Sequence, residues 1–392
     1  MPQASVALRK NSRLNDSSKN EPSETFPGWS KETYGTFAKE LDGIYAEIRK
    51  SLGKKDVAYI KSIEKTAHRM EILGRLLIHC SLDPFTWWVG VLALFIHKQI
   101  NATEIGHSAL HGSWDNFPEC ENLHSKRFKW NTPIDEASWR HEHNILHHQY
   151  TNIVGKDPDL NYGLLRSAEQ IKWLPFHLLQ LGQFFVTAPF FMWVIGIYAS
   201  GLVDLLRPES GDSFGRVIPD KKPKTILKTL KRTFRKFIPY SAKNFVFWPA
   251  LAGPFWWKVL AANLTVDVMR GVYSAATIYA GHFGSDLEYY DKDYRPRSKG
   301  EWFKSQVEAA HNYEVPYGIS VLCGALDLQI EHHLFPQLPP NRLREIQPKV
   351  AAVCKRYGVK YQSDSWGKNL KAALARLAKL SLPSRDSNPQ GR

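Results

Sequence analysis

The sequence has few cysteines, and they form no pattern that binds a metal or builds a disulfide framework. Its 392 residues include only Cys80, Cys120, Cys323 and Cys354, which lie far apart along the chain. Thiolate zinc sites and small disulfide-stabilised domains both depend on closely spaced cysteines. The sequence therefore argues against both and fits a reducing compartment.

The first 28 residues lack the apolar core of a secretory signal peptide. They are rich in serine, asparagine and glutamate, and such a segment cannot bury enough apolar surface to fold. We therefore interpret residues 1–28 as a disordered tail.

Negative charge is scarce relative to positive charge, with 38 acidic residues against 52 lysines and arginines and a formal net charge of +14. This balance fits anionic lipid, a phosphorylated carrier or an acidic protein partner. Zinc-finger spacing and RNA-binding aromatic motifs are both missing, so we expect no nucleic acid partner.

Histidine, by contrast, is abundant and clustered, because eight of the fifteen histidines fall in three short segments. Two histidines four residues apart share one face of a helix and can direct their imidazoles to one volume. Neutral imidazole binds iron, zinc, copper and nickel, so the clusters predict a metal site without selecting the metal. The segments are EIGHSALHG with His107 and His111, WRHEHNILHH with His141, His143, His147 and His148, and QIEHHLFP with His332 and His333.

Three apolar stretches predict about four membrane-spanning helices, since a bilayer core needs roughly 20 helical residues. Residues 72–96 are apolar on both sides of Asp83 and Pro84, a pair that favours a turn, so we expect a helical hairpin there. Residues 173–203 carry no charged side chain, and residues 259–282 form the last stretch.

The number of crossings between the second and third histidine segments must be even if the two share a site. We therefore interpret residues 245–257, which Pro249 interrupts, as interfacial or re-entrant. Residues 259–282 then retain Asp267 and Arg270, whose three-residue spacing permits pairing.

A basic segment at residues 221–236 conflicts with this arrangement. It holds eight lysines or arginines and no acid, and such density beside a span marks the cytoplasmic side. With these spans it would face away from the histidine segments. In the alternative arrangement, residues 173–203 fold back and never cross.

Helical periodicity of the remaining apolar residues completes the expected organisation. Residues 29–71 are expected to form cytosolic amphipathic helices, and 72–365 the domain that contains the histidine segments. A helix is expected over 343–357, and residues 366–392 should form a basic amphipathic helix followed by a tail.

The segments HSALH, HNILHH and QIEHH, in this order, resemble the three histidine boxes of the integral-membrane fatty acid desaturases. Flanking residues agree, among them Gly106 and the Asp157-Pro158-Asp159 sequence. The resemblance covers about residues 73–362 and is nearest to bacterial acyl desaturases and to linoleoyl-type enzymes. In these, glutamine opens the third box, as Gln329 does here.

The resemblance implies an all-α integral membrane protein with about four transmembrane helices and a cytosolic helical cap. The cap would carry a histidine-rich di-iron site, with the boxes on the cytoplasmic face. Four further residues are implied as additional ligands or as hydrogen-bonding neighbours of ligands, namely Gln329, His141, His311 and Asp157. The implied iron ligands are His107, His111, His143, His147, His148, His282, His332 and His333.

The activity implied is that of a fatty acyl desaturase, which uses two iron ions, dioxygen and external electrons to insert a cis double bond. The substrate would be an acyl chain in a thioester such as acyl-CoA or in a membrane lipid. The sequence has no His-Pro-Gly-Gly haem-binding signature, so a separate donor such as a ferredoxin or a flavin-dependent reductase is expected. Hydroxylation of an alkyl chain at the same site and membrane metal transport remain as alternatives.

Overall fold

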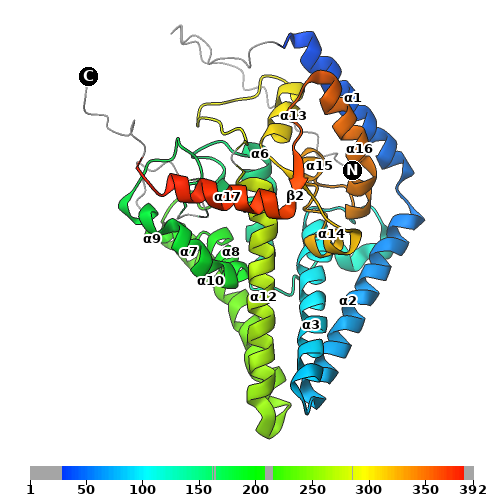
Figure 1. Ribbon diagram of the computed structural model, residues 1–392, viewed down its shortest axis with the longest axis vertical. Coiled ribbons are helices and arrows are strands. Elements are labelled where there is room, and N and C mark those ends of the chain that lie inside the picture. The colour runs from blue at the N-terminus through cyan, green and yellow to red at the C-terminus, as the bar shows by residue number, and fades with distance from the viewer. Residues whose placement is uncertain (1–28, 161, 163–164, 208–214, 285, 384–392) are drawn as a thin grey trace.

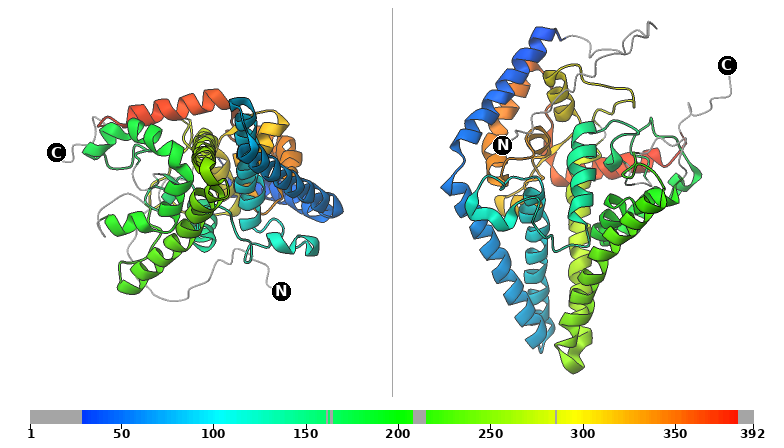
Figure 2. Two further views of the ribbon diagram at one scale, coloured as in Figure 1. Left: turned by 90° about the horizontal axis from the view of Figure 1, so that it is seen from below. Right: turned by 180° about the vertical axis from the view of Figure 1, so that it is seen from behind.

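In the computed structural model, two long helical hairpins extend from a broader helical cap (Figure 1). The structure describes residues 29–383 except 161, 163–164, 208–214 and 285. The predicted tail at 1–28 and the end of the predicted C-terminal tail lie outside the described residues. Both hairpins point away from the cap, as the view from behind also shows (Figure 2).

The first hairpin consists of α2 (Lys54–Cys80) and α3 (Pro84–Ile100). Asp83 caps α3 by accepting a hydrogen bond from the Thr86 backbone N–H at 2.9 Å, and Pro84 occupies its first turn. This confirms the predicted turn. The two helices pack closely because a Cβ atom added at Gly74 would lie 2.8 Å from the Leu94 backbone nitrogen. Helix α2 continues across residue 71, where a domain boundary was predicted.

The second hairpin pairs α12 (Trp256–His282) with a continuous helical run made of α10 (Pro223–Ser241), the π-helical η7 (Ala242–Phe247) and α11 (Trp248–Ala250). The 3-10 turn η8 (Gly253–Phe255) joins the two limbs. Residues 245–257 thus form the tip of a hairpin, and their predicted interfacial or re-entrant position in a membrane stays a prediction. The helix predicted at 259–282 is confirmed as part of α12.

The apolar stretch predicted as one span at 173–203 is divided by 3-10 turns. It comprises η5 (Pro175–Leu179), α7 (Gln180–Thr187), η6 (Ala188–Phe190) and α8 (Phe191–Ala199). Among the described residues, Pro175–Ala199 is the single helical stretch that is long and apolar enough, by length and composition, to cross a membrane. Its helices lie obliquely against α12 (Figure 1).

The basic residues of α10 lie beside the second histidine box. Lys236 Nζ donates to Glu136 at 2.7 Å, and Arg235 pairs with Asp135. Both acids stand at the start of α5 (Glu136–His141), which leads into the box. The expectation that the basic segment faces away from the boxes is therefore wrong, and the fold-back alternative agrees with the structure.

Buried charges join the two hairpins. Asp267 accepts from Lys98 Nζ at 2.8 Å and from the Tyr240 hydroxyl at 2.7 Å, and it lies 3.3 Å from Arg270. The predicted pairing of Asp267 with Arg270 is confirmed. Lys98, on α3, is an additional partner that connects the hairpins.

The cap packs α1 (Lys31–Ser51) against α13 (Lys299–Glu308) and α16 (Pro340–Tyr357), around a core that includes Phe37, Leu41 and Ile346. Helix α16 confirms the helix predicted over 343–357. Two three-residue strands, β1 (Asn312–Glu314) and β2 (Ser363–Ser365), pair in parallel. The fold is therefore mostly helical, and the two strands depart from the predicted all-α class.

The remaining described helices are short, except for the C-terminal α17, which crosses the cap (Figure 1). They are α4 (Ser108–Leu110), η2 (Pro118–Leu123), α6 (His148–Tyr150), η4 (Pro158–Leu160), α9 (Leu202–Leu206), α14 (Tyr317–Cys323), α15 (Gln329–Leu334) and α17 (Trp366–Leu380), together with the π-helical η1 (Asn101–His107) and η3 (Glu142–His147).

Candidate metal centre

The first two histidine boxes lie on π-helical segments. Segment η1 ends at His107 and continues α3, whereas η3 contains His143 and His147. π-turns are rare and occur frequently at functional sites, because they rotate the following side chains relative to an α-helix. The third box forms α15, and His282 is the last residue of α12. Four separate helical segments therefore supply the histidines.

The box histidines form two adjoining groups. In the first, one ligand atom each from His107, His111, His143 and His332 lies within 4.8 Å of the others. In the second, His147, His282 and His333 meet the same condition. The His148 ring lies between the groups, with its centroid 4.8 Å from that of His111 and 4.6 Å from that of His333. All eight side chains are buried.

The ring nitrogens of these groups lack the partners that buried polar atoms require. A buried donor or acceptor without a partner costs about 1–3 kcal/mol. His107 Nε2 and His143 Nε2 are 3.3 Å apart, close to the roughly 3 Å expected between neighbouring ligands about 2.1 Å from one ion. The residues thus fit metal coordination. Among the eight histidines of this site, the buried ring nitrogens without a partner in the described chain are Nε2 of His111, His147, His332 and His333 and Nδ1 of His148 and His282.

Asp157 fixes the orientation of His147. The His147 Nδ1–H donates to Asp157 Oδ1 at 3.0 Å, while the Asn152 backbone N–H donates to the other carboxylate oxygen at 2.8 Å. This leaves His147 Nε2 free to face the cluster, an arrangement common around metal-bound histidines. Asp157 therefore contacts a candidate ligand and is not in either group itself.

At every histidine of the site except His147, burial favours the neutral imidazole, the form that binds metal. Burial lowers the pKa of His143 to about 4. Burial acts on His147 too, but the charges of Asp157 and Asp159 raise its pKa to about 9. Burial also lowers the pKa well below the ordinary value for His107, His111, His148, His332 and His333.

Two of the predicted histidines lie outside the groups. The His141 side chain is exposed at the end of α5, because the helix turns that residue away from the face that carries His143. His311 is buried, and its backbone N–H donates to the Gly281 carbonyl at 2.9 Å, next to His282. Its ring packs on Gly284 and joins neither group.

Gln329 is held against α12. Its side chain is 1% exposed, and neither amide atom has a hydrogen-bond partner among the described residues. A Cβ atom added at Gly281 would lie 2.4 Å from Gln329 Cγ, so glycine permits this approach. The amide therefore faces the site with its hydrogen-bonding capacity unused.

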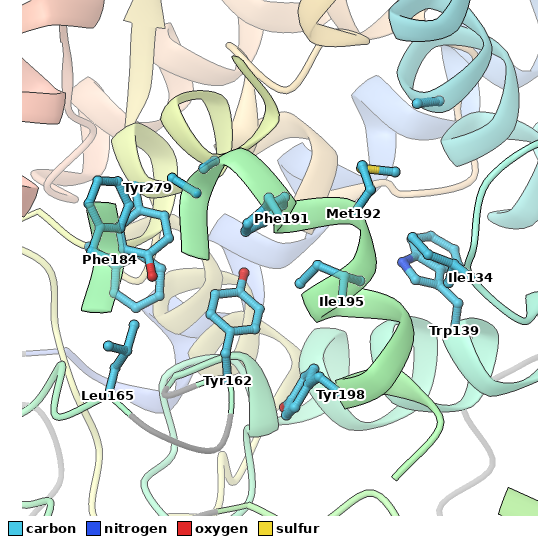
Figure 3. Packing of buried hydrophobic residues seen from close by; sticks show 14 of the residues in the cluster. Ile134, Trp139, Tyr162, Leu165, Phe184, Phe191, Met192, Ile195, Tyr198 and Tyr279 are labelled. Atoms are coloured by element: carbon cyan, nitrogen blue, oxygen red, sulfur yellow. The ribbon is translucent and has the colours of Figure 1, made fainter. Parts of the chain in front are cut away.

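A largely apolar cavity opens onto the first histidine group. Its walls include His107, His143, His282 and Gln329, and it passes between α8 and α12. Figure 3 shows Phe191, Met192 and Ile195 beside Trp139 in this region. The apolar side chains of the wall are Ala102, Trp130, Ile134, Trp139, Tyr162, Phe191, Met192, Ile195, Ile278 and Leu326.

Glu142 is a wall residue that the sequence prediction missed. It is 2% exposed, and burial together with the charge of Asp159 raises its pKa well above the ordinary value. It is therefore a buried acid in contact with the cavity, and its surroundings favour the protonated form. The available sequence signal was its position between His141 and His143, because an acid within a buried histidine cluster is expected to be buried with the histidines.

Comparisons with known proteins agree with this geometry. Residues 85–365 match the fatty acid desaturase family. The chain is 34% identical over 356 residues to the NADPH-dependent stearoyl-CoA 9-desaturase of Mycobacterium tuberculosis (strain CDC 1551 / Oshkosh), which covers 89% of this chain and 80% of that protein. It is 30% identical over 250 residues to the acyl-lipid (7-3)-desaturase of Diacronema lutheri, and this match covers 62% of this chain and 52% of that protein. It is 23% identical over 282 residues to the sn-1 linoleoyl-lipid 6-desaturase of Synechocystis, and this match covers 70% of this chain and 74% of that protein. The chain therefore belongs to the fatty acid desaturase family.

Proposed function

We propose that this desaturase introduces a cis double bond into an acyl chain with two iron ions, dioxygen and two external electrons. The observation that carries the proposal is the pair of adjoining imidazole groups, whose free ring nitrogens converge beside an apolar cavity. In the balanced reaction, one hydrogen leaves each of two neighbouring carbons. Dioxygen takes up these hydrogens with two electrons and two protons to form two waters.

The seven histidines of the two groups, together with His148 between them, are the eight proposed iron ligands. Iron held by these residues would supply the oxidising chemistry that breaks unactivated C–H bonds, which side-chain acids and bases cannot do. The chain itself orients the ligands through Asp157, excludes water with the apolar wall and positions the acyl chain beside His107 and His143. Gln329 is proposed to hydrogen-bond a water or to contact the acyl chain.

The two hairpins are proposed to cross or enter the membrane, with the cap on the cytoplasmic face. Both hairpins expose large apolar side chains, which a bilayer would cover. The basic residues of α10 lie on the cap side, as the positive-inside rule expects of a cytoplasmic face. The exposed residues include Leu82, Phe85, Trp88 and Leu92 on the first hairpin and Val246, Leu251, Phe255, Trp256 and Leu264 on the second.

The proposed substrates are acyl chains in thioester or lipid-ester form. The similar proteins are named for both, as a stearoyl-CoA desaturase and as acyl-lipid desaturases. Electrons would come from a separate protein, such as a ferredoxin or a flavin-dependent reductase, and the NADPH-dependent relative is consistent with a reduced nicotinamide as their source.

Product identification tests this function. The protein is expressed in a host that lacks the expected product, and the acyl chains are analysed by mass spectrometry with and without His332→Ala. A new monounsaturated chain that depends on His332 supports desaturation. A hydroxylated chain at the same carbon would instead assign the hydroxylase alternative, and no modified chain would contradict both.

A further inference from the structure

A second hollow lies between α17 and α7, which is one of the oblique apolar helices. Its volume is about 500 Å³, within the range of roughly 300–1,000 Å³ typical of small-molecule sites. Its lining is nearly all apolar. The lining residues are Leu181, Phe185, Gly367, Leu370, Lys371, Leu374, Ala375 and Ala378, which define the α7/α17 groove.

Hydrogen bonds hold α17 at both ends of this groove. Trp366 Nε1 donates to the Ala276 carbonyl of α12 at 3.2 Å. Near the other end, the buried Gln180 Nε2 donates to the Leu377 carbonyl at 2.7 Å. Between these points, Asn369 Nδ2 donates to the Asn312 carbonyl at 3.0 Å and Ala373 is buried in the core, so α17 is held along its length and the groove is a feature of the fold rather than a frayed edge.

The surroundings of the groove match a membrane lipid. Phe185, Val186 and Phe190 are 59%, 69% and 55% exposed and form an apolar surface that continues from the groove. Lys371 stands in the groove lining without an ion-pair partner among the described residues. An apolar floor with a cationic side chain at its edge fits an acyl chain joined to an anionic headgroup.

Three aromatic rings in series, those of Phe184, Tyr279 and Tyr162, lie between the helix that lines the groove and the cavity at the candidate metal centre. The ring centroids of Phe184 and Tyr279 are 4.5 Å apart, and those of Tyr279 and Tyr162 are 6.4 Å apart. Tyr162 lines the cavity, while Leu181, in the same hydrophobic cluster, lines the groove. Figure 3 shows Phe184 and Tyr279 together on one side of Tyr162 and Phe191.

We propose that the α7/α17 groove binds an acyl chain of an anionic membrane phospholipid and is the route by which an ester-linked chain reaches the metal centre. The Phe184, Tyr279 and Tyr162 rings are the barrier that such a chain must displace. This inference rests on the proposed desaturase function and assigns the groove to one of its two proposed substrate classes, the ester-linked chains of membrane lipids.

Photo-cross-linking tests occupancy of the groove independently of activity. The full chain is placed in nanodiscs of phosphatidylglycerol whose acyl chain carries a diazirine, and cross-linked residues are mapped by mass spectrometry. We expect cross-links on Leu370 and Leu374 of α17. The variant Ala375→Trp should reduce them about tenfold, because filling the groove removes burial of roughly two methylenes at about 0.8 kcal/mol each. Ala372→Trp, on α17 outside the groove, is the matched control.

Activity on two substrates then tests the route. Ala375→Trp should lower desaturation of the phosphatidylglycerol chains about tenfold and leave desaturation of the same chain as a CoA thioester unchanged. No cross-links on α17 in the wild type, or an equal loss with both substrates, would overturn the inference. A wild-type protein inactive on both substrates would contradict the proposed function, while the cross-links would still decide whether the groove binds lipid.

Discussion

At the residue scale, Gln329 is where this site departs from an all-histidine set. Its amide is buried, unpartnered and pressed against Gly281, and an amide oxygen is a weaker ligand for iron than imidazole. We expect Gln329→Ala to keep its iron but to lose rate or regioselectivity, whereas His332→Ala loses iron and activity. Iron content measured beside the product profile checks this. Loss of iron in Gln329→Ala, restored in Gln329→His, would make Gln329 a true ligand.

Asp157 offers a second test at this scale. Asp157→Asn removes the carboxylate that accepts from His147 Nδ1 while preserving the size of the side chain. Because such partners orient and strengthen metal ligands, we expect iron affinity to fall by about 10–100-fold. Competition with a chelator measures it. Asp42→Asn, in a surface pair with Lys299, should leave the affinity unchanged, and an equal effect of both substitutions would contradict the assignment.

Much of the site was predictable at this scale, because histidine spacing is visible in a sequence. His107, His111, His143, His332 and the second group came together as their motifs indicated. The orientation of His141 was not predictable, since helical spacing alone does not say which face a π-turn will present. Glu142 was missed because its role depends on burial, and burial follows from tertiary packing, which also buries Tyr162 and Tyr198 and brings them near enough for the Glu142 charge to raise the pKa of each further.

At the scale of elements, the Asp56–Arg342 pair ties the start of α2 to α16. Asp56 is fully buried, and its carboxylate accepts from Arg342 Nη2 at 2.9 Å. Burial alone would raise the pKa of Asp56, but hydrogen bonds from Arg342 and Asn341 hold it below its ordinary value of 3.8. A carboxyl group whose folded pKa is depressed stabilises the fold above its unfolded pKa, and this contribution is lost as the pH falls.

The pair predicts a pH-dependent stability difference. Asp56→Asn should destabilise the fold by about 3 kcal/mol at neutral pH, since it leaves the Arg342 charge uncompensated. The difference from wild type should be complete above about pH 5 and should shrink below pH 3.8, as Asp56 itself becomes protonated. Thermal unfolding in detergent across this range measures it. Glu345→Gln, at the exposed partner of Arg342, should show little change, and a difference independent of pH would contradict the explanation.

The elements also show where sequence periodicity was insufficient. The turn at Asp83 and the helix at 343–357 follow from local capping and spacing. The conformations of residues 173–203 and 245–257 depend on tertiary contacts, which sequence periodicity does not report. Pro249 sits where η7 passes into α11, a place that tolerates it, so a proline that looked like an interruption did not end the hairpin.

At the scale of the whole molecule, two ligand groups predict two metal ions. We expect the purified protein to hold about two irons and little zinc per chain, because the imidazoles exceed the four ligands of a tetrahedral zinc site. Removing the metal should lower the melting temperature, since six ring nitrogens would again lack partners. Elemental analysis and thermal unfolding with and without chelator check this. One zinc per chain, with activity insensitive to chelation of iron, would contradict the di-iron proposal.

The orientation of the molecule can be tested with a cysteine already present. Cys80 is the one exposed cysteine of the four, and it ends α2 at the tip of the first hairpin. In the proposed orientation, a membrane-impermeant maleimide added to intact cells reaches Cys80. A cysteine placed on the cap by Lys355→Cys, in a Cys80→Ser background, should react only after the membrane is opened. Labelling of both from the same side would refute the proposed arrangement.

The ion pair between Lys98 and Asp267 has a consequence for biosynthesis. The two residues are separated by 169 positions, and at about 5–20 residues per second α12 emerges on the order of ten seconds or more after α3. In the proposed membrane arrangement, the first hairpin must therefore wait at the translocon with an unneutralised lysine. A nascent chain interrupted before α12 would carry that charge into lipid at a cost of roughly 2.5–3.5 kcal/mol. Completion of the chain is thus itself a step in securing its insertion.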